Sequence, residues 1–218
     1  MKYWFSLIIL FLAFHAQSVE VFTTMVQGLH EKKGGGAYDK MINTVNGTSL
    51  TPLPTARAVM VFNGSQGCLS PANKDPNFYS DYANDAFIES KPMGEARVYI
   101  FTSPNKEAIS ELSKLQGKKV GARIGFDYGK NVESSGVKLI RTKEIQQKIN
   151  KLLAGRIDAI IDFTPDMLIA FEVLKMDPLP YVTGAPLDIH EDRVLCKNTP
   201  DNERFIQQLN NQMHTGSL

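Results

Sequence analysis

The sequence predicts an α/β fold of two lobes with a central cleft, because two stretches of the chain repeat one order of elements. In the second half, residues 118–125 have the pattern of a strand that ends in a glycine turn, and 128–134 can begin a helix. An apolar stripe at helical spacing follows over 145–153, and Gly155 ends that helix. Residues 157–161 then have the pattern of a short buried strand.

The first half of the chain repeats this order. Residues 19–25 alternate as a strand does, and 37–45 place apolar residues on one face of a helix. Pro52 marks the end of a strand, 56–62 form a second helix, and a short strand surrounds Cys68. Two such units predict two similar lobes, and a cleft between lobes is where small ligands usually bind.

The remaining segments predict how the chain passes between the lobes. Residues 97–101 form the first crossing strand, and 193–197 form the returning strand. Apolar residues at helical spacing predict further helices within 103–115, 162–175 and 202–213.

Two crossings make the first lobe discontinuous along the chain. Lobe one is expected to consist of residues 19–96 and 190–218. Lobe two is expected to consist of residues 97–189.

The chain begins with a pattern that is typical of a secretory leader. Lys2 precedes an apolar run over residues 4–14, and a small-x-small cleavage site ends at Ser18. The run is shorter than the roughly 20 apolar residues of a membrane helix, and an uncleaved anchor is the alternative. We therefore predict a leader over residues 1–18 and a mature protein in the periplasm.

The charge balance excludes some classes of partner. The full sequence has 24 basic and 23 acidic side chains, and Lys2 leaves with the leader, so the mature chain has no net charge. Binding to nucleic acid or to anionic lipid demands an excess of Lys and Arg, so neither is an expected partner.

The sequence has 2 cysteines, Cys68 and Cys196. An exported protein meets an oxidising compartment, so a disulfide between them is one expectation and two separately buried thiols are the other. Two cysteines without a nearby pair of histidines do not favour a zinc site, so neither a metal nor another cofactor is expected.

Five short motifs occur in an order that is characteristic of one family. They are LPTARA at 53–58, SKP at 90–92, LQGKKVG at 115–121, IGFDYG at 124–129 and LAGRIDA at 153–159. With them, nearly the whole mature chain resembles the extracellular solute-binding proteins of family 3. The resemblance implies the type II periplasmic-binding-protein fold with two crossing strands. It also implies a monomer that captures a small-molecule solute and delivers it to a membrane ABC permease.

The same resemblance implies something about the ligand, because family members that bind α-amino acids use two charged residues. An Arg after the first crossing strand holds the carboxylate, and an Asp after the strand of lobe two holds the ammonium. Here Thr102 and Ser103 follow the crossing strand, and Phe163 stands in the place of the acid. Asp162 comes one residue early, and such a shift turns a side chain to the opposite face of a strand. The usual clamp is therefore expected to be absent, and ordinary α-amino acids are not the expected ligands.

Candidate ligand contacts lie at strand ends and helix starts, where unpaired backbone N–H groups face a cleft. The turn at 125–129 is the best of these, and its alternative is a turn that needs glycine for backbone reasons alone. Aromatic residues near it indicate a ligand with a flat or apolar part and one anionic end. The candidate contacts are Thr23, Thr24, Arg57, Ser70, Arg123, Phe126, Asp127, Tyr128, Asp162, Phe163 and Thr164.

Three functions therefore compete. The first is a periplasmic binding protein for an ABC-type importer, and the second is a ligand sensor that partners a membrane receptor. The third is a cleft enzyme of the same fold, for which His190, Asp127 and Asp162 are the candidate acids and bases. No catalytic triad or metal cluster is recognisable around these residues, so the sequence favours binding over catalysis.

Overall fold

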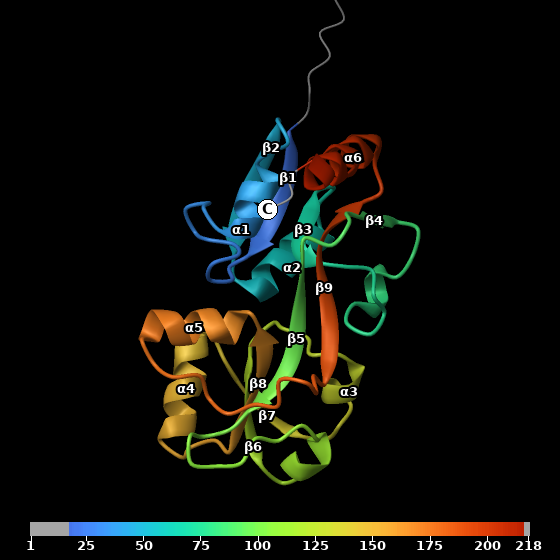
Figure 1. The fold of residues 1–218 in the computed structure, drawn as a ribbon. Helices are drawn as coiled ribbons and strands as arrows, with labels where there is room; N and C mark the ends of the chain where they lie inside the picture. The colour runs from blue at the N-terminus through green and yellow to red at the C-terminus, as the bar shows by residue number, and fades with distance from the viewer. Residues whose placement is uncertain (1–17, 216–218) are drawn as a thin grey trace, which may run out of the picture.

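The computed structural model describes residues 18–215, and one mixed sheet runs through both halves of the molecule (Figure 1). In order across the sheet, its strands are β2 (Thr48–Leu53), β1 (Val19–Thr24), β3 (Cys68–Ala72), β9 (Asp188–Lys197), β5 (Gly94–Phe101), β8 (Ala159–Thr164), β6 (Lys119–Arg123) and β7 (Lys138–Thr142). A short strand, β4 (Phe87–Glu89), pairs with β9 beside this path. Of the predicted leader, residues 1–17 lie outside the described residues.

Helices cover the two ends of this sheet. They are α1 (Ala37–Ile42), α2 (Thr55–Asn63), α3 (Lys130–Glu133), α4 (Ile145–Leu153), α5 (Asp166–Leu174) and α6 (Pro200–Thr215). We call β1 to β4 with α1, α2 and α6 lobe one, and β6 to β8 with α3, α4 and α5 lobe two (Figure 1). None of the helices within residues 18–215 has both the length and the apolar character to cross a bilayer.

Both lobes follow the order strand, helix, strand, helix, strand. In lobe one β1 pairs in parallel with β2 and β3, and in lobe two β6 pairs in parallel with β7 and β8. The predicted order lacked the strand between the two helices of lobe two, β7. This strand lies at the edge of the sheet and is only partly buried, so its apolar pattern is weak.

Alternate residues of each central strand pack on opposite faces of the sheet, as the pleat requires. In lobe one Val21 packs with Ile42 of α1, whereas Phe22 packs with Phe62 of α2. Phe62 is fully buried, and burying a side chain of this size contributes about 2 to 3 kcal/mol. These two apolar layers hold the β1 strand end in a fixed place beside the cleft.

The strands β5 and β9 connect the lobes and pair with each other from Gly94↔Asp192 to Val98↔Asp188. Towards lobe two β5 also pairs with β8, and towards lobe one β9 also pairs with β3. The predicted lobe boundaries, at 96/97 and 189/190, therefore fall inside β5 and β9. Figure 1 shows both strands running from one lobe into the other.

Two predicted helices are shorter in the structure. The helix predicted over 37–45 ends at Ile42, because Asn43 and Thr44 turn the chain and the Thr44 hydroxyl donates to the Met41 carbonyl. The helix predicted within 103–115 is a single 3₁₀ turn, Leu112–Leu115. The apolar residues of this segment still pack on the core of lobe two. Their spacing therefore indicated that they are buried, but not that they form a full helix.

Candidate ligand-binding cleft

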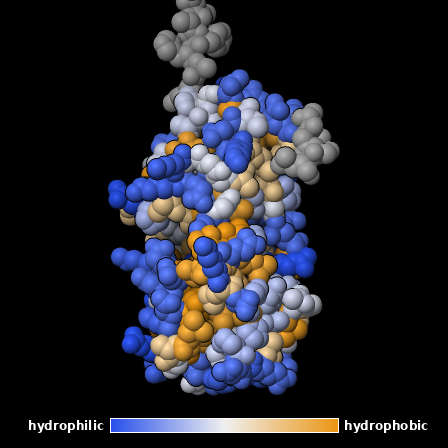
Figure 2. All heavy atoms as spheres, turned by 60° about the vertical axis from the view of Figure 1, so that its left-hand side comes forward, coloured by the Kyte–Doolittle hydropathy of each residue, from blue (hydrophilic) through white to orange (hydrophobic). Residues whose placement is uncertain are grey.

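A cavity lies between the two lobes and holds about 570 Å³ of empty space, part of it open to solvent. Lobe one lines it with β1 and α2 residues such as Thr24 and Val59, and lobe two contributes Phe126 and Phe163. Figure 2 shows apolar residues at the surface in the middle of the molecule and in its lower half, between polar ones. A ligand in this cavity would touch both lobes at once.

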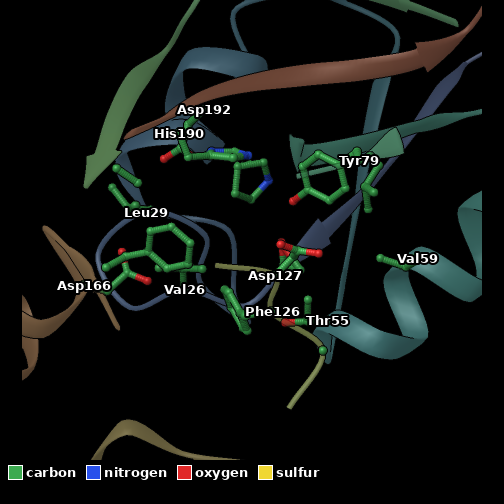
Figure 3. A pocket seen from close by; sticks show the side chains of 16 residues that line it. Val26, Leu29, Thr55, Val59, Tyr79, Phe126, Asp127, Asp166, His190 and Asp192 are labelled. Carbon is green, nitrogen blue, oxygen red and sulfur yellow. The ribbon is translucent and has the colours of Figure 1, made fainter. Parts of the chain in front are cut away.

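The polar groups of the cavity are mainly acceptors of hydrogen bonds. Asp127, Asp166 and Asp192 line it together with His190 (Figure 3). None of the described residues that line this space is Lys or Arg. The cavity therefore carries negative charge without a lining cation to balance it.

His190 belongs to a chain of hydrogen bonds that enters the cavity from β9. The Tyr38 hydroxyl donates to Asp192 Oδ2 over 2.8 Å, and His190 Nδ1 lies 2.8 Å from Asp192 Oδ1. Because a carboxylate only accepts, Nδ1 carries the proton in this contact. The side chain of His190 is buried, and its Nε2 atom has no hydrogen-bond partner within the described residues. An unpaired buried nitrogen on a cavity wall is a natural place for a ligand group.

Asp127 lies within the glycine turn of lobe two, and its carboxylate lies between Tyr79, Phe126 and His190 (Figure 3). Its Oδ1 atom accepts the Gly129 N–H over 2.8 Å. Burial raises the pKa of the Asp127 carboxyl, and the nearby Glu133 adds to this effect. The Gly129 N–H, Arg141 and His190 lower it in part.

Aromatic rings form much of the remaining wall. Phe163 stacks on Tyr128 with ring centroids 5.2 Å apart and lies 6.3 Å from the Phe126 ring. Its ring also meets the His190 ring edge-on at 6.3 Å. Burial and the Asp192 carboxylate raise the pKa of the Tyr79 phenol, so this group stays protonated at neutral pH. The cavity is thus a flat-walled space with acceptors on one side.

The two lobes come close to each other beside this cavity. A Cβ atom at Gly125 would lie 2.9 Å from the Ala56 nitrogen at the start of α2. Gly125 also has a φ of +83°, which side chains other than glycine rarely adopt. The glycine is therefore needed for the turn and for the close approach of the two lobes.

No family model and no curated protein sequence matches this chain, but solved structures match nearly its whole length. The GluR0 ligand-binding core from Nostoc punctiforme, in complex with L-glutamate, is 15% identical, with a TM-score of 0.72 over 91% of this chain and 94% of that one. The arginine-bound form of truncated ArgBP from T. maritima is 14% identical, with a TM-score of 0.66 over 90% and 95%. The substrate binding protein of an amino acid ABC transporter is 15% identical, with a TM-score of 0.64 over 90% and 92%.

The chain has the type II periplasmic-binding-protein fold. The predicted fold class is thereby confirmed, because two lobes, a cavity between them and two crossing strands are all present.

In this protein a buried network of ion pairs lies at the end of the lobe-two strands. Arg123 donates from Nε to Asp162 Oδ1 over 3.0 Å, and its terminal nitrogen contacts Asp162 at 2.8 Å and Asp166 at 2.5 Å. The Lys148 ammonium pairs with the other oxygen of Asp162. Burial lowers the pKa of Lys148, and the neighbouring Arg123 lowers it further, against the opposing effect of Asp166.

Lobe one of the binding-protein fold has a different buried cluster. His30 Nδ1 lies 2.7 Å from Asp39 Oδ1, and His30 Nε2 lies 2.9 Å from the Ser70 hydroxyl. This order of Ser, His and Asp resembles a hydrolytic triad, but Ser70 is fully buried and does not line the cavity. Asp39 Oδ2 also accepts the N–H groups of Glu31, Gly35 and Gly36, so the cluster fixes the glycine loop before α1.

The structure brings some of the predicted site residues together and separates others. Thr24, Phe126, Asp127 and Phe163 line the cavity. Buried elsewhere, without lining it, are Thr23, Ser70, Arg123, Tyr128 and Asp162. Arg57 is exposed and Thr164 is half-buried, and neither lines the cavity.

Among the lining residues that the list of predicted contacts lacked are the polar residues His190 and Asp192, as well as Tyr79 and Asp166. His190 and Asp192 stand two positions apart in β9, so their side chains leave the same face of the strand. A His-x-Asp pattern was the signal in the sequence. The predicted returning strand began only at Arg193, which left both residues outside it.

Cys68 and Cys196 form a disulfide in the structure. The two cysteines face each other in the pairing of β3 with β9. Of the two expectations from the sequence, the structure has the bridged one.

Proposed function

We propose that this protein captures a small solute between its two lobes and delivers it to an ABC-type importer. The observation that carries this proposal is the cavity, whose walls come from both lobes and from the two connecting strands. The structural likeness supports it, because one matched structure is the substrate binding protein of an amino acid ABC transporter. The predicted leader adds a location, since such a protein would act in the periplasm.

Closure of the lobes is the mechanical step in this proposal. The strands β5 and β9 are the connections, so a hinge through them opens and closes the cavity. A solute that touches Thr24 in lobe one and Phe163 in lobe two binds the closed form better than the open form. This difference in affinity drives closure, and the closed form is what a permease recognises.

The contacts we propose for the solute combine predicted and newly found residues. From the predicted set, Thr24, Phe126, Asp127 and Phe163 line the cavity. His190 joins them because its Nε2 atom is buried without a partner. Arg123 is already paired with two carboxylates, so it is not available to hold a carboxylate of the solute.

A sensor role is the second candidate, and one specific observation favours it. The GluR0 ligand-binding core has a TM-score of 0.72 to this chain, above the 0.64 of the transporter protein. A sensor and a transport protein need the same clamp, so the partner decides between them. Copurification of the exported protein with either a permease or a receptor from its own membranes distinguishes the two.

A thermal-shift screen of the mature chain tests solute capture. Binding to the folded state raises the melting temperature with the excess of ligand over its dissociation constant. We expect at least one compound among amines, organic acids, amino acids, sugars and polyamines to raise it. A cavity that responds to none of these classes, in a chain shown to be folded, would falsify the proposal.

A further inference from the structure

We propose that the ligand of this cavity is a small organic amine with one aromatic or apolar body and no carboxylate. The inference rests on the proposed solute capture and adds the ligand class. It is carried by two side chains on one cavity wall (Figure 3): Asp127, which has no ion-pair partner within residues 18–215, and His190, whose buried Nε2 atom has no hydrogen-bond partner there.

Both groups can accept a hydrogen bond from the ligand. Asp127 accepts the Gly129 N–H at Oδ1, which leaves its other oxygen for a further donor. His190 donates from Nδ1 to Asp192, and this tautomer of the imidazole has an acceptor at Nε2. An alkylammonium group carries three N–H donors, which is enough for both acceptors.

Of the three lining carboxylates, Asp127 is the one whose hydrogen bond within residues 18–215 comes from a backbone N–H and not from a side chain. Asp166 is paired with Arg123 at 2.5 Å, and Asp192 receives hydrogen bonds from Tyr38 and His190. The nearby Arg141 is bound to Glu133 and does not line the cavity. Asp127 is half-buried, and a carboxylate that is partly removed from water gains from a cationic partner, which an ammonium ion supplies.

A carboxylate on the ligand would have the opposite effect. It would enter a space lined by Asp127, Asp166 and Asp192, with no Lys or Arg on the described part of its wall. The anionic end that the sequence indicated therefore does not suit this cavity. The same argument excludes α-amino acids, whose carboxylate would lose its hydration without gaining a cation.

The body of the ligand is set by the rings around Asp127. Phe126, Tyr79 and Phe163 line the cavity, and Val26 and Leu29 of lobe one close its other side. Flat walls favour a flat ring, and aromatic faces also attract the ammonium group through their quadrupole. One aromatic ring with a short aminoalkyl arm matches this arrangement.

Three probes that share a phenyl ring and a short chain test the proposal by calorimetry with the mature chain. They are 2-phenylethylamine, 3-phenylpropionate and L-phenylalanine. We expect the dissociation constant of 2-phenylethylamine to be lower than that of either other probe by about tenfold or more. The reason is that the cavity offers a partner to its ammonium group and none to a carboxylate. Equal or tighter binding of 3-phenylpropionate or L-phenylalanine would overturn the inference, as would no binding of the amine.

The variant Asp127→Asn tests the role of the carboxylate, since the amide oxygen can still accept the Gly129 N–H. We expect this variant to weaken the binding of 2-phenylethylamine by about tenfold or more. The binding of 3-phenylpropionate should be unchanged or tighter. The control is Asp177→Asn, which removes the same charge from an exposed residue of lobe two outside the cavity and leaves both affinities unchanged. Equal weakening of the amine by both variants would overturn the pairing with Asp127.

These results separate the ligand class from the proposed function. If a carboxylate probe binds and the amine does not, the amine inference fails and solute capture stands. If none of the three probes and no compound of the thermal-shift screen binds, the amine inference and the proposed solute capture both fail.

Discussion

The two lobes share one arrangement of strands and helices, but they stabilise the edge of the cleft with different chemistry. In lobe one, a histidine joins one carboxylate and one hydroxyl, in the cluster of His30, Asp39 and Ser70. In lobe two, two cations and two carboxylates form a buried network of Arg123, Lys148, Asp162 and Asp166. The same backbone topology therefore does not dictate the polar interior.

The difference shows where each lobe can meet a ligand. In lobe two, Arg123 is paired within the network and does not line the cavity. The lining of this lobe therefore includes Asp127 and aromatic rings. The cluster of lobe one links the glycine loop to Ser70 of β3, and this lobe lines the cavity with uncharged residues such as Val26 and Leu29. Two of the three lining carboxylates, Asp127 and Asp166, thus come from lobe two, and the third, Asp192, comes from the connecting strand β9.

The largest expected effect comes from breaking the network of lobe two at its centre. Asp162→Asn leaves Arg123 and Lys148 buried beside a neutral amide, which we expect to cost about 3 to 5 kcal/mol of unfolding free energy. Urea unfolding of the mature chain measures it. The control Asp158→Asn makes the same change at a half-buried residue before β8, and it should cost less than about 1 kcal/mol. Equal losses in the two variants would show that the network is not a special source of stability.

The next effect concerns the covalent link of lobe one, for which lobe two has no counterpart. The disulfide joins residues 128 positions apart, so its loss frees a long loop of the unfolded chain. The double variant Cys68→Ala/Cys196→Ala should lose about 3 kcal/mol of unfolding free energy. Treatment with a reductant is the matched measurement, and it should destabilise the parent protein without affecting the double variant. A reductant that destabilises both would show that the bridge is not the cause.

Much of the architecture could be predicted from sequence because it depends on local patterns. Gly155 after an apolar helical stripe, and alternation over β1, placed those elements within a few residues. The strand β7 was not predicted, because an edge strand buries few side chains and its apolar pattern is weak. The cavity was harder to predict, since distant parts of the chain form it: Asp192 accepts a hydrogen bond from Tyr38, which lies 154 positions away. Arg123 seemed free in sequence for the same reason, as its partner Asp166 lies 43 positions away.

A smaller effect tests the cluster of lobe one through its pH dependence. Burial alone would raise the pKa of Asp39, but hydrogen bonds from His30 and three backbone N–H groups lower it below its ordinary value. A carboxyl with a lowered folded-state pKa stabilises the protein above its unfolded pKa, about 4, and loses that contribution as the pH falls further. We expect Asp39→Asn to cost about 2 kcal/mol at pH 7 and the difference from the parent to shrink below about pH 4.

Urea unfolding between pH 3 and pH 7 measures this difference. The control Asp85→Asn changes an exposed carboxylate of the same lobe, and its small effect should not vary with pH. A cost of Asp39→Asn that stays constant down to pH 3 would contradict the assigned hydrogen bonds.

The smallest expected effect lies where lobe one meets the connecting strands, at the Tyr38 hydroxyl. It donates to Asp192, which also receives the proton of His190 Nδ1, so Asp192 keeps one partner when the hydroxyl is removed. Tyr38→Phe should therefore cost only about 1 kcal/mol, far less than Asp162→Asn, which leaves two cations without a full partner. Chemical denaturation measures the loss, and Tyr82→Phe is the matched control, because it removes a hydroxyl that donates to the neutral Asn63. If Tyr38→Phe costs as much as Asp162→Asn, the contrast is wrong: the hydrogen-bonded side would then be as sensitive as the ionic one, and Asp192 would depend on Tyr38 more than on His190.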